Sequence, residues 1–429
     1  MERERLIKLI WGGLNFILLL AASFFPILIQ VVLISGIITN IFLIYQFRYV
    51  QPAMIMMIFC LSYLGFLTPY YFYNYTIAEH TKYYNSELFN KALVIHVLFL
   101  TSFSVFLKPQ LNSSKLLIKN LIPTASNPII FYLLVFAMFT LLVTVKGESV
   151  ISTTGDSYQT YIDNIDAQGG SLEYFYILYI SAFFFANKKF QKILLILIFL
   201  IYSYNCAIRG YRIQMVQMVF LAFVLFFDGK FKNFFLVFMC FFGFIMSEIL
   251  SILKTLGTVS MESLAKAFEF SGTGEVIITN QTDVFYSSVV FLGLIEDSIL
   301  DIQTRIWSAL GFILNWFLPS SFVWKEARLP EFGHEFTTFG GGGLVSVYFF
   351  VWFGYLGVVV LGASLAFCFN KLFTGAIRYY NVIGIMILSV YPRWFAYDPG
   401  NFLMRFSLYM FVFFFILMLI DKQMKSNSL

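Results

Sequence analysis

The sequence predicts an all-α, polytopic membrane protein with about twelve transmembrane helices. Hydrophobic residues make up 60% of its 429 residues and charged residues only 12%, which lies outside the range of soluble globular domains. Mainly apolar runs of about 20 residues, the length that crosses the hydrocarbon core of a bilayer, recur along the chain. Lysines cluster in several short connections between these runs, as they do on the cytoplasmic side of polytopic proteins.

The apolar runs define the predicted spans in order. They lie near residues 7–25, 27–46, 52–69, 89–107, 128–145, 172–187, 190–206, 212–228, 233–250, 344–369, 375–394 and 400–420. The first run resembles a cleavable signal peptide, because charged residues precede it and Ala21-Ala22-Ser23 ends it. Apolar sequence resumes directly after Pro26, so we interpret this run as an uncleaved first span.

The distribution of Lys and Arg between the connections predicts the orientation of the chain in the membrane. With the N-terminus inside, the inner connections hold 16 of the 28 Lys and Arg residues but only 4 of the 23 Asp and Glu residues. The clusters Lys188–Lys192, Lys230–Lys232 and Lys422–Lys425 all fall on this side. Both termini are therefore expected in the cytoplasm. A basic inner face next to anionic lipid accounts for the net charge of +5, so no nucleic-acid partner is expected.

The whole chain, 1–429, is predicted to form one transmembrane domain, with residues 251–343 as a long external loop between the ninth and tenth spans. In this loop Asp297, Asp301 and Arg305 recur at a spacing of four, on one predicted helical stripe. A second stripe holds Ile299, Ile302 and Ile306. The pattern predicts an amphipathic helix at the membrane surface, and the loop is expected to contain interfacial or re-entrant helices.

Several classes of metal or nucleotide site lack their motifs. The sequence contains no Asp-x-Asp, no glycine-rich phosphate loop with lysine and no His-Glu-x-x-His. The segment Asn164–Gly169 resembles part of a calcium loop, but Phe175 stands where the twelfth-position glutamate is required. The four cysteines lie far apart and favour neither a disulfide framework nor a zinc site. We therefore predict no metal and no cofactor.

Two arginines belong to a very tight outer turn between the seventh and eighth spans. Arg209 and Arg212 are three residues apart at the edge of the predicted hydrocarbon. One interpretation extends both side chains to lipid headgroups. Two arginines on the outer side, against the positive-inside trend, favour an anion site instead. A diphosphate suits guanidinium groups because each offers a forked, permanently charged set of donors.

Two further arginines, Arg393 and Arg405, are predicted at the same outer level as additional diphosphate ligands. Arg405 is expected about one and a half turns into the last span. Asp398 and Glu248 are candidate partners for them, so structural ion pairs are the alternative interpretation.

His334 is the candidate general base among only three histidines. It lies in a polar loop beside Glu335, where an imidazole with a pKa near 6.5 can accept a proton at neutral pH. The run Gly340–Gly343 follows and indicates either flexibility or close backbone approach. An ordinary surface histidine before a flexible linker is the alternative. His80 and His96 are interpreted as structural.

The outer connection Tyr70–Leu88 contains six tyrosines. We interpret them first as an aromatic belt at the membrane interface. A platform on which sugars stack is the second interpretation.

The order of these motifs resembles the oligosaccharide repeat-unit polymerases of the O-antigen (Wzy) class. In that family a short Arg-Gly-x-Arg-type outer turn precedes a span, as Arg209-Gly210-Tyr211-Arg212 does here. A long external loop then leads into a span marked Phe-Gly-x-x-Gly, here Phe353-Gly354-Tyr355-Leu356-Gly357 after Gly333-His334-Glu335. The related O-antigen ligases carry His-Asn before a similar span. This chain departs from them with His-Glu, and with Phe where they have Glu.

The resemblance implies a metal-independent membrane glycosyltransferase of the GT-C type that joins repeat units carried on undecaprenyl diphosphate. It implies that His334, aided by Glu335, deprotonates the acceptor hydroxyl. The diphosphate would be held by Arg209, Arg212, Arg393 and Arg405. The active site would face the periplasm at the bacterial inner membrane. Expected partners are lipid-linked oligosaccharides, membrane lipids and, as a candidate, a chain-length regulator.

Two alternatives stay open. An O-antigen ligase would share the fold and the donor but use lipid A–core as acceptor. A lipid-linked oligosaccharide flippase would belong to another class, and should show internal repeats with charges in both halves at mid-membrane. No repeat at a fixed spacing is visible, and the charges lie on the outer side.

Overall fold

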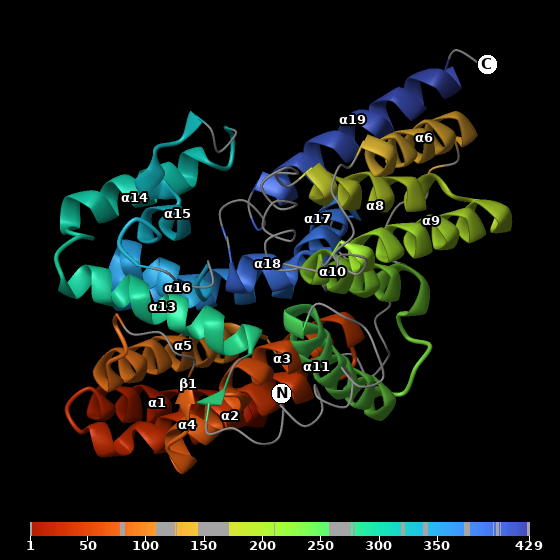
Figure 1. Cartoon of the computed structure of the whole chain (residues 1–429). Helices are drawn as coiled ribbons and strands as arrows, with labels where there is room; N and C mark the ends of the chain where they lie inside the picture. The colour runs from red at the N-terminus through yellow and green to blue at the C-terminus, as the bar shows by residue number, and fades with distance from the viewer. Residues whose placement is uncertain are drawn as a thin grey trace. The chain divides into compact units, whose positions relative to one another are not determined.

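The computed structural model describes residues 2–77, 82–108, 125, 127–144, 171–209, 211–256, 276–277, 279–318, 322–337, 342–372, 378–397, 399, 403 and 405–426. Within these residues the chain is helical almost throughout, which confirms the all-α class (Figure 1). The described strands are two residues long, β1 (Thr76–Ile77) and β2 (Val276–Ile277), and they pair in parallel.

The chain divides into two compact units, each assembled from separate parts of the sequence. Unit 1 comprises Met1–Leu116, Glu275–Ala376 and Pro392–Arg405. Unit 2 comprises Leu117–Gly274, Ile377–Tyr391 and Phe406–Leu429.

Unit 1 is built around a central helix, α5. Its helices are α1 (Glu2–Ala22), η1 (Pro26–Leu28), α2 (Ile29–Gln46), α3 (Gln51–Gly65), α4 (Thr68–Tyr73), α5 (Ser86–Phe106), α13 (Asn280–Glu296), α14 (Ile302–Leu314), η6 (Lys325–Ala327), α15 (Leu329–Gly333), α16 (Val345–Leu372) and α18 (Tyr391–Ala396). The side chains of α5 are mainly apolar on every face of the helix, which is typical of a buried helix. It packs against α16, α2, α1 and α13, so most of its side chains are buried.

Unit 2 contains a second set of helices. They are α6 (Pro128–Thr144), η3 (Ser171–Tyr174), α8 (Phe175–Phe185), α9 (Lys189–Ile208), α10 (Arg212–Ala222), the π-helical segment η4 (Phe223–Phe227), α11 (Asn233–Leu256), α17 (Arg378–Ser389) and α19 (Phe406–Ser426). In this unit α8 packs on α6, α10 on α9, and α17 on α19.

Seven helices of the described chain are long and apolar enough to cross a membrane, so the protein is a membrane protein. They are Glu4–Ala22, Pro26–Gln46, Gln51–Tyr73, Ser86–Phe106, Lys189–Ala207, Val345–Leu372 and Phe406–Ser426. Shorter apolar helices cover Pro128–Thr144, Leu172–Phe185, Ile213–Phe227 and Asn233–Ile245. The prediction of one continuous helix over residues 375–394 is wrong, because α17 ends at Ser389 and α18 begins at Tyr391. Pro392 lacks the N–H that a continuous helix would need there.

Hydrogen bonds in unit 1 bring three helix ends together. The Lys8 ammonium of α1 donates to the Leu107 carbonyl after α5 at 2.8 Å. The Asn370 amide near the end of α16 accepts from the Lys108 N–H at 2.8 Å and donates to the Phe106 carbonyl at 3.1 Å. The start of α1, the end of α5 and the end of α16 therefore lie close together.

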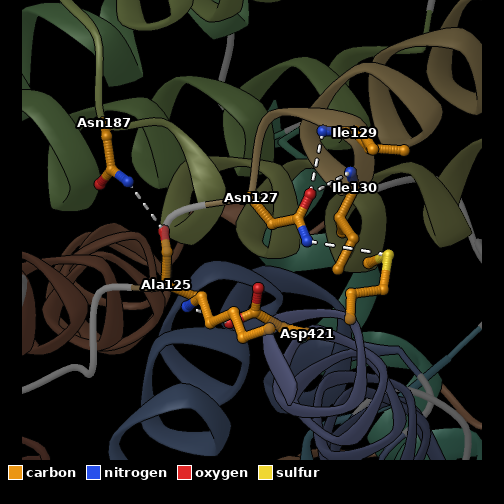
Figure 2. Close-up of polar contacts among 8 residues, drawn as sticks. Ala125, Asn127, Ile129, Ile130, Asn187 and Asp421 are labelled. Atoms are coloured by element: carbon orange, nitrogen blue, oxygen red, sulfur yellow. Dashed lines mark hydrogen bonds and ion pairs between the residues drawn. The ribbon is translucent and has the colours of Figure 1, made fainter. Parts of the chain in front are cut away.

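A corresponding junction in unit 2 is drawn in Figure 2. Asn127 caps α6, since its side-chain oxygen accepts from the N–H groups of Ile129 at 3.0 Å and Ile130 at 3.4 Å. The Asn187 amide donates to the Ala125 carbonyl at 3.2 Å. The Asn127 amide also lies 3.9 Å from the Met424 sulfur in α19. The start of α6, the α8–α9 connection and the end of α19 therefore meet.

Candidate functional site

The arginine turn of unit 2 has the tight geometry that the sequence predicts. Helix α9 ends at Ile208, Arg209 is its C-cap, and α10 begins at Arg212. The buried Tyr211 N–H donates to the Cys206 carbonyl at 2.9 Å and closes the turn. Arg209 is half-buried, and its guanidinium has no hydrogen-bond partner among the described residues. The Arg212 side chain lies outside what the structure describes.

A buried polar cluster beside this turn was not anticipated from the sequence. Tyr176 of α8 donates to the Gln214 carbonyl at 3.0 Å and to Gln217 Oε1 at 3.2 Å. The Tyr202 hydroxyl of α9 donates to the Tyr176 oxygen at 3.1 Å, and Gln214 Nε2 lies 3.5 Å from the buried Glu173 carboxylate. These bonds hold the first turn of α10, where Arg212 lies, against α8 and α9. The spacing of Gln214 and Gln217 in an apolar span is the signal that could have revealed the cluster.

His334 lies at the C-terminal end of α15 in unit 1. Its backbone N–H donates to the Pro330 carbonyl at 3.1 Å, which closes the short helix, and one part of its side chain is accessible to solvent. Partial burial lowers the pKa of His334 below its usual value, and the nearby Glu331 carboxylate opposes this shift. A lowered pKa leaves the imidazole neutral at neutral pH, which is the form that accepts a proton.

The acidic residues near His334 have other partners as well. Glu335 forms an ion pair with Lys325, while Glu331 pairs with Arg328 at 2.5 Å. The sequence places Glu335 beside His334, whereas the carboxylate that raises the pKa of His334 is Glu331. Both ion pairs are substantially exposed, so each contributes at most about 1 kcal/mol to stability.

The tyrosine-rich connection reaches this region and is held in place by hydrogen bonds. Lys82 donates to the Phe336 carbonyl at 3.2 Å, and the Tyr83 hydroxyl donates to the Asp297 carboxylate at 2.7 Å. The Tyr84 oxygen accepts from the Ile77 N–H at 2.9 Å. These contacts join the Tyr70–Leu88 connection to the ends of α13 and α15, a proximity that sequence spacing alone could not show.

Of the other two histidines, His96 is fully buried in α5 and His80 lies outside the described residues. His96 Nδ1 is 3.4 Å from the Ser346 hydroxyl, and its ring packs edge-on to Phe395 at 5.8 Å between centroids. These contacts agree with the structural interpretation of His96.

The described half of the glycine run is packed closely. Gly342 has φ of 80°, and a Cβ added there would lie 2.6 Å from Tyr397 Cα. A Cβ at Gly343 would lie 2.8 Å from the Phe291 ring. The Ser288 hydroxyl accepts from the Leu344 N–H at 2.8 Å. These glycines therefore permit close approach of the backbone, one of the two interpretations that the sequence left open.

Arg405 holds the end of another helix. It is π-helical and directly precedes α19, which begins at Phe406. The side chain is buried, and its Nε donates to the Asn315 carbonyl at 2.7 Å. Its Nη2 donates to the Asn315 side-chain oxygen and to the Leu318 carbonyl, the latter at 2.6 Å. The guanidinium thus satisfies carbonyl groups at the C-terminal end of α14.

Arg393 lies in α18 and is half-buried. Its guanidinium lies 5.5 Å from the centroid of the Tyr397 ring. The proposed acidic partners, Asp398 and the side chain of Glu248, lie outside what the structure describes.

The Phe353–Gly357 motif interrupts α16. Gly354 has φ of 63° and ψ of −158°, which only glycine adopts without strain. A non-helical residue breaks the hydrogen bonds that cross it, and this releases carbonyls in the preceding turn. The Arg305 guanidinium of α14 donates to two carbonyls there, those of Val351 and, at 3.4 Å, Phe350. A Cβ at Gly357 would lie 2.5 Å from the Phe349 carbonyl oxygen, so the second glycine is also sterically required.

The predicted stripe through Asp297, Asp301 and Arg305 is wrong, because α14 begins only at Ile302. Asp297 is the C-cap of α13, and Ser298 follows in a left-handed conformation with φ of 60°. Asp301 is the N-cap of α14, and its carboxylate accepts from the Thr304 N–H at 2.7 Å. Asp301 begins α14, and Asp297 follows the last residue of α13. The spacing of four between them therefore crosses the turn between two helices and does not lie along one helix.

The six predicted site residues divide between the units. His334, Glu335, Arg393 and Arg405 belong to unit 1, and Arg209 and Arg212 to unit 2. Comparisons with protein-family models, curated proteins and solved structures find no match. The function must therefore be inferred from the residues described above.

Proposed function

We propose that this protein is a membrane glycosyltransferase that polymerises oligosaccharide repeat units carried on undecaprenyl diphosphate. The reaction takes place at the outer leaflet of the bacterial inner membrane, with twelve spans of the GT-C type and both termini in the cytoplasm. Its partners are lipid-linked oligosaccharides, surrounding lipids and, as a candidate, a chain-length regulator. The proposal includes no metal, cofactor or nucleic acid.

The geometry of the arginine turn carries this proposal. Arg209 lies at the end of a membrane-length helix, and no acceptor among the described residues engages its guanidinium. A permanently charged group in this position is costly unless it meets an anion. The cluster around Tyr176 and Gln214 fixes the turn that carries Arg209 and Arg212. Two arginines on a turn held in this way suit a diphosphate, because its oxygens accept forked hydrogen bonds from guanidinium groups.

The glycine motif gives further support. Both glycines of the motif have a structural reason. Gly354 has a backbone conformation that strains any other residue, and a Cβ at Gly357 would collide with the Phe349 carbonyl oxygen. The motif follows the His334 loop in the order that the resemblance implies. Arg305 of α14 donates to a carbonyl next to the break in α16. The motif therefore helps to position α14, which belongs to the external stretch.

In the proposed reaction, a ring nitrogen of His334 takes the proton from an acceptor hydroxyl. The hydroxyl oxygen attacks the anomeric carbon of the donor glycan and forms the new glycosidic bond. The bond between that carbon and the diphosphate oxygen breaks, and undecaprenyl diphosphate leaves with the electron pair. Arginine stabilises the charge that develops on the leaving group. Glu335 is retained as a candidate assistant to His334.

Reconstitution tests the proposal directly. Purified protein in liposomes receives lipid-linked repeat units, and the products are separated on a gel. A ladder of products is expected. A single adduct on added lipid A–core would indicate a ligase, and no new glycosidic bond with movement of substrate across the bilayer would indicate a transporter.

The role of His334 is tested in the same assay. His334→Ala is expected to slow polymerisation about 10²–10⁴-fold, the usual loss when a positioned base is removed. His334→Gln is a matched variant that keeps size and hydrogen bonding but not the basic nitrogen, and it should be equally slow. Normal rates at normal expression would exclude His334 and make Glu335 the candidate base.

A further inference from the structure

One face of helix α14 packs against other helices of unit 1. Ser308, Ala309, Gly311 and Phe312 are buried, and Ser308 accepts a hydrogen bond from the Trp352 indole at 2.9 Å. A Cβ at Gly311 would lie only 2.1 Å from Ala327 Cβ, so η6 lies directly against this face. The helix is also held near both ends, by Arg305 on the α16 carbonyls and by Arg405 on Asn315. Its orientation about its own axis is therefore fixed.

The opposite face of α14 is apolar and exposed. It carries a stripe at spacings of four, four and three residues, formed by Ile302, Ile306, Leu310 and Ile313, and Phe317 follows in the turn after the helix. Ile302 is 74% exposed and Phe317 is 59% exposed. Phe322, in the segment that follows, is 75% exposed. A contiguous apolar surface of this kind marks a contact with another apolar phase or partner.

The charge pattern identifies that phase as lipid. No charged residue occurs from Ile306 to Trp324, and the run is bounded by the cations Arg305 and Lys325. Trp307 and Trp324 lie edge to face at 5.5 Å, and the Trp324 indole donates to the Trp307 carbonyl at 3.0 Å. Tryptophans with a satisfied polar edge, next to cations that flank an apolar surface, are typical of the membrane interface.

The length of the helix sets its direction. Helix α14 has 13 residues and is about 20 Å long at 1.5 Å per residue, whereas the hydrocarbon core is about 30 Å thick. It cannot cross, so an apolar face of this length must lie in the plane of the bilayer. An open pocket of about 780 Å³ lies at its N-terminal end. Its apolar lining residues are Ile295, Leu300, Ile302, Ile306, Trp307 and Leu310, and its polar ones are Ser298, Asp301, Gln303 and Arg305.

We propose that the stripe of α14 and the adjoining pocket bind the acyl chains of bilayer phospholipid, with α14 lying in the outer leaflet as an in-plane helix. This inference does not depend on the glycosyltransferase proposal. It assigns to the external stretch a lipid contact that would hold its described helices at a set depth in the membrane.

Spin labels on single introduced cysteines test the proposal in phosphatidylcholine nanodiscs. The background carries Cys240→Ser and Cys368→Ser, since the other two native thiols are about 1% exposed and a reagent cannot reach them. Labels at Leu310 and Ile313 are compared for collision with oxygen, which concentrates in lipid, and with a nickel chelate, which stays in water.

Two matched positions calibrate the experiment. Leu200, exposed on the membrane-length helix α9, reports lipid, and the exposed Glu331 of α15 reports water. At Leu310 and Ile313 the oxygen-to-nickel collision ratio should rise severalfold above that at Glu331 and approach that at Leu200. A ratio like that of Glu331 would place the stripe in water and overturn the proposal. Low collision with both reagents would mean that protein, such as a second copy of the chain, covers the stripe.

An independent measurement uses no introduced cysteine. Phospholipids brominated on the acyl chains should quench the fluorescence of Trp307, which is 49% exposed on the edge of the stripe. Trp307→Phe should therefore reduce the quenchable fraction relative to Trp394→Phe, whose indole is 1% exposed. Equal loss in the two variants would contradict contact between Trp307 and lipid.

Discussion

The arginines of unit 1 and unit 2 look alike in the sequence but differ in what they contact. Arg405 and Arg305 donate to backbone carbonyls at the end of α14 and at the break in α16. Arg209 has no hydrogen-bond partner among the described residues. All three lie in or beside apolar segments, where a guanidinium must either meet acceptors of the protein or meet an anion from outside.

The contacts of Arg405 identify it as a structural arginine. A helix that ends or breaks leaves carbonyl groups without intrahelical partners. An arginine that donates to these carbonyls has fewer N–H groups left to bind a phosphate. Arg405 uses two of its nitrogens in this way. The diphosphate role is therefore better supported for the Arg209–Arg212 turn than for Arg405.

Removal of Arg405 should have the largest effect on stability. Arg405→Ala leaves the acceptors on Asn315 and Leu318 without their donor in a buried site, at a cost of about 1–3 kcal/mol for each group. We expect a loss of about 3 kcal/mol or more, measured as thermal unfolding in detergent. Arg405→Lys should recover only part of it, because a point charge cannot replace the fork. The matched variant Arg209→Ala should change the free energy of unfolding by about 0.5 kcal/mol or less. Equal losses at the two positions would contradict the proposed difference between Arg405 and Arg209.

Lysine at Arg209 or Arg212 should reduce activity and leave folding intact. A snorkelling arginine needs only a positive group on a long stem, whereas a diphosphate ligand needs the planar fork. Loss of a charge-assisted hydrogen bond costs about 1.5–3 kcal/mol, which is roughly tenfold or more in affinity for undecaprenyl diphosphate. Polymer yield and lipid binding are the measurements, and Arg→Ala should be worse than Arg→Lys at either position. If both lysine variants retain full activity, the pair anchors the turn to headgroups only.

Gly354→Ala tests the break that Arg305 satisfies. A side chain at φ of 63° and ψ of −158°, a region essentially restricted to glycine, should destabilise unit 1 by about 1–3 kcal/mol. Gly13→Ala is the matched control, because Gly13 lies inside α1 with no atom within 4 Å of an added Cβ. There alanine should stabilise the helix by about 0.5–1 kcal/mol. Opposite signs in thermal unfolding are expected, and a neutral Gly354→Ala would mean that α16 can run continuously through this position.

Glu331→Gln should have the smallest effect, a shift of the acidic limb of the pH–rate profile. If His334 is the base, activity requires its neutral form and is lost as pH falls through the pKa of its imidazole, which partial burial already lowers. The Glu331 carboxylate raises that pKa, so its removal should move the loss of activity to still lower pH. Glu335→Gln is the comparison variant, because Glu335 pairs with Lys325. A larger shift with Glu335→Gln would restore Glu335 as the partner of His334.

The sequence alone determined features that depend on local chemistry. Apolar runs of membrane length and their composition predicted an all-helical membrane protein, because burial in lipid requires about 20 consecutive apolar residues. The tight Arg209–Arg212 turn followed from two adjacent apolar runs with almost nothing between them. The importance of Gly354 was visible as a motif, although its reason, a positive φ inside a helix, was not.

Only the tertiary structure decided which groups meet across long separations. Asn315 and Arg405 are 90 residues apart, and Lys82 and Phe336 are 254 apart, so no periodicity relates them. The start of α14 was mispredicted because a spacing of four is shared by a helix and by a turn that ends in a capping aspartate. A charged side chain in an apolar segment requires hydrogen-bond partners, and this requirement is visible in the sequence. The partners here are backbone carbonyls, which every residue has, so the sequence does not identify them. The fold alone selects which of them are left unpaired.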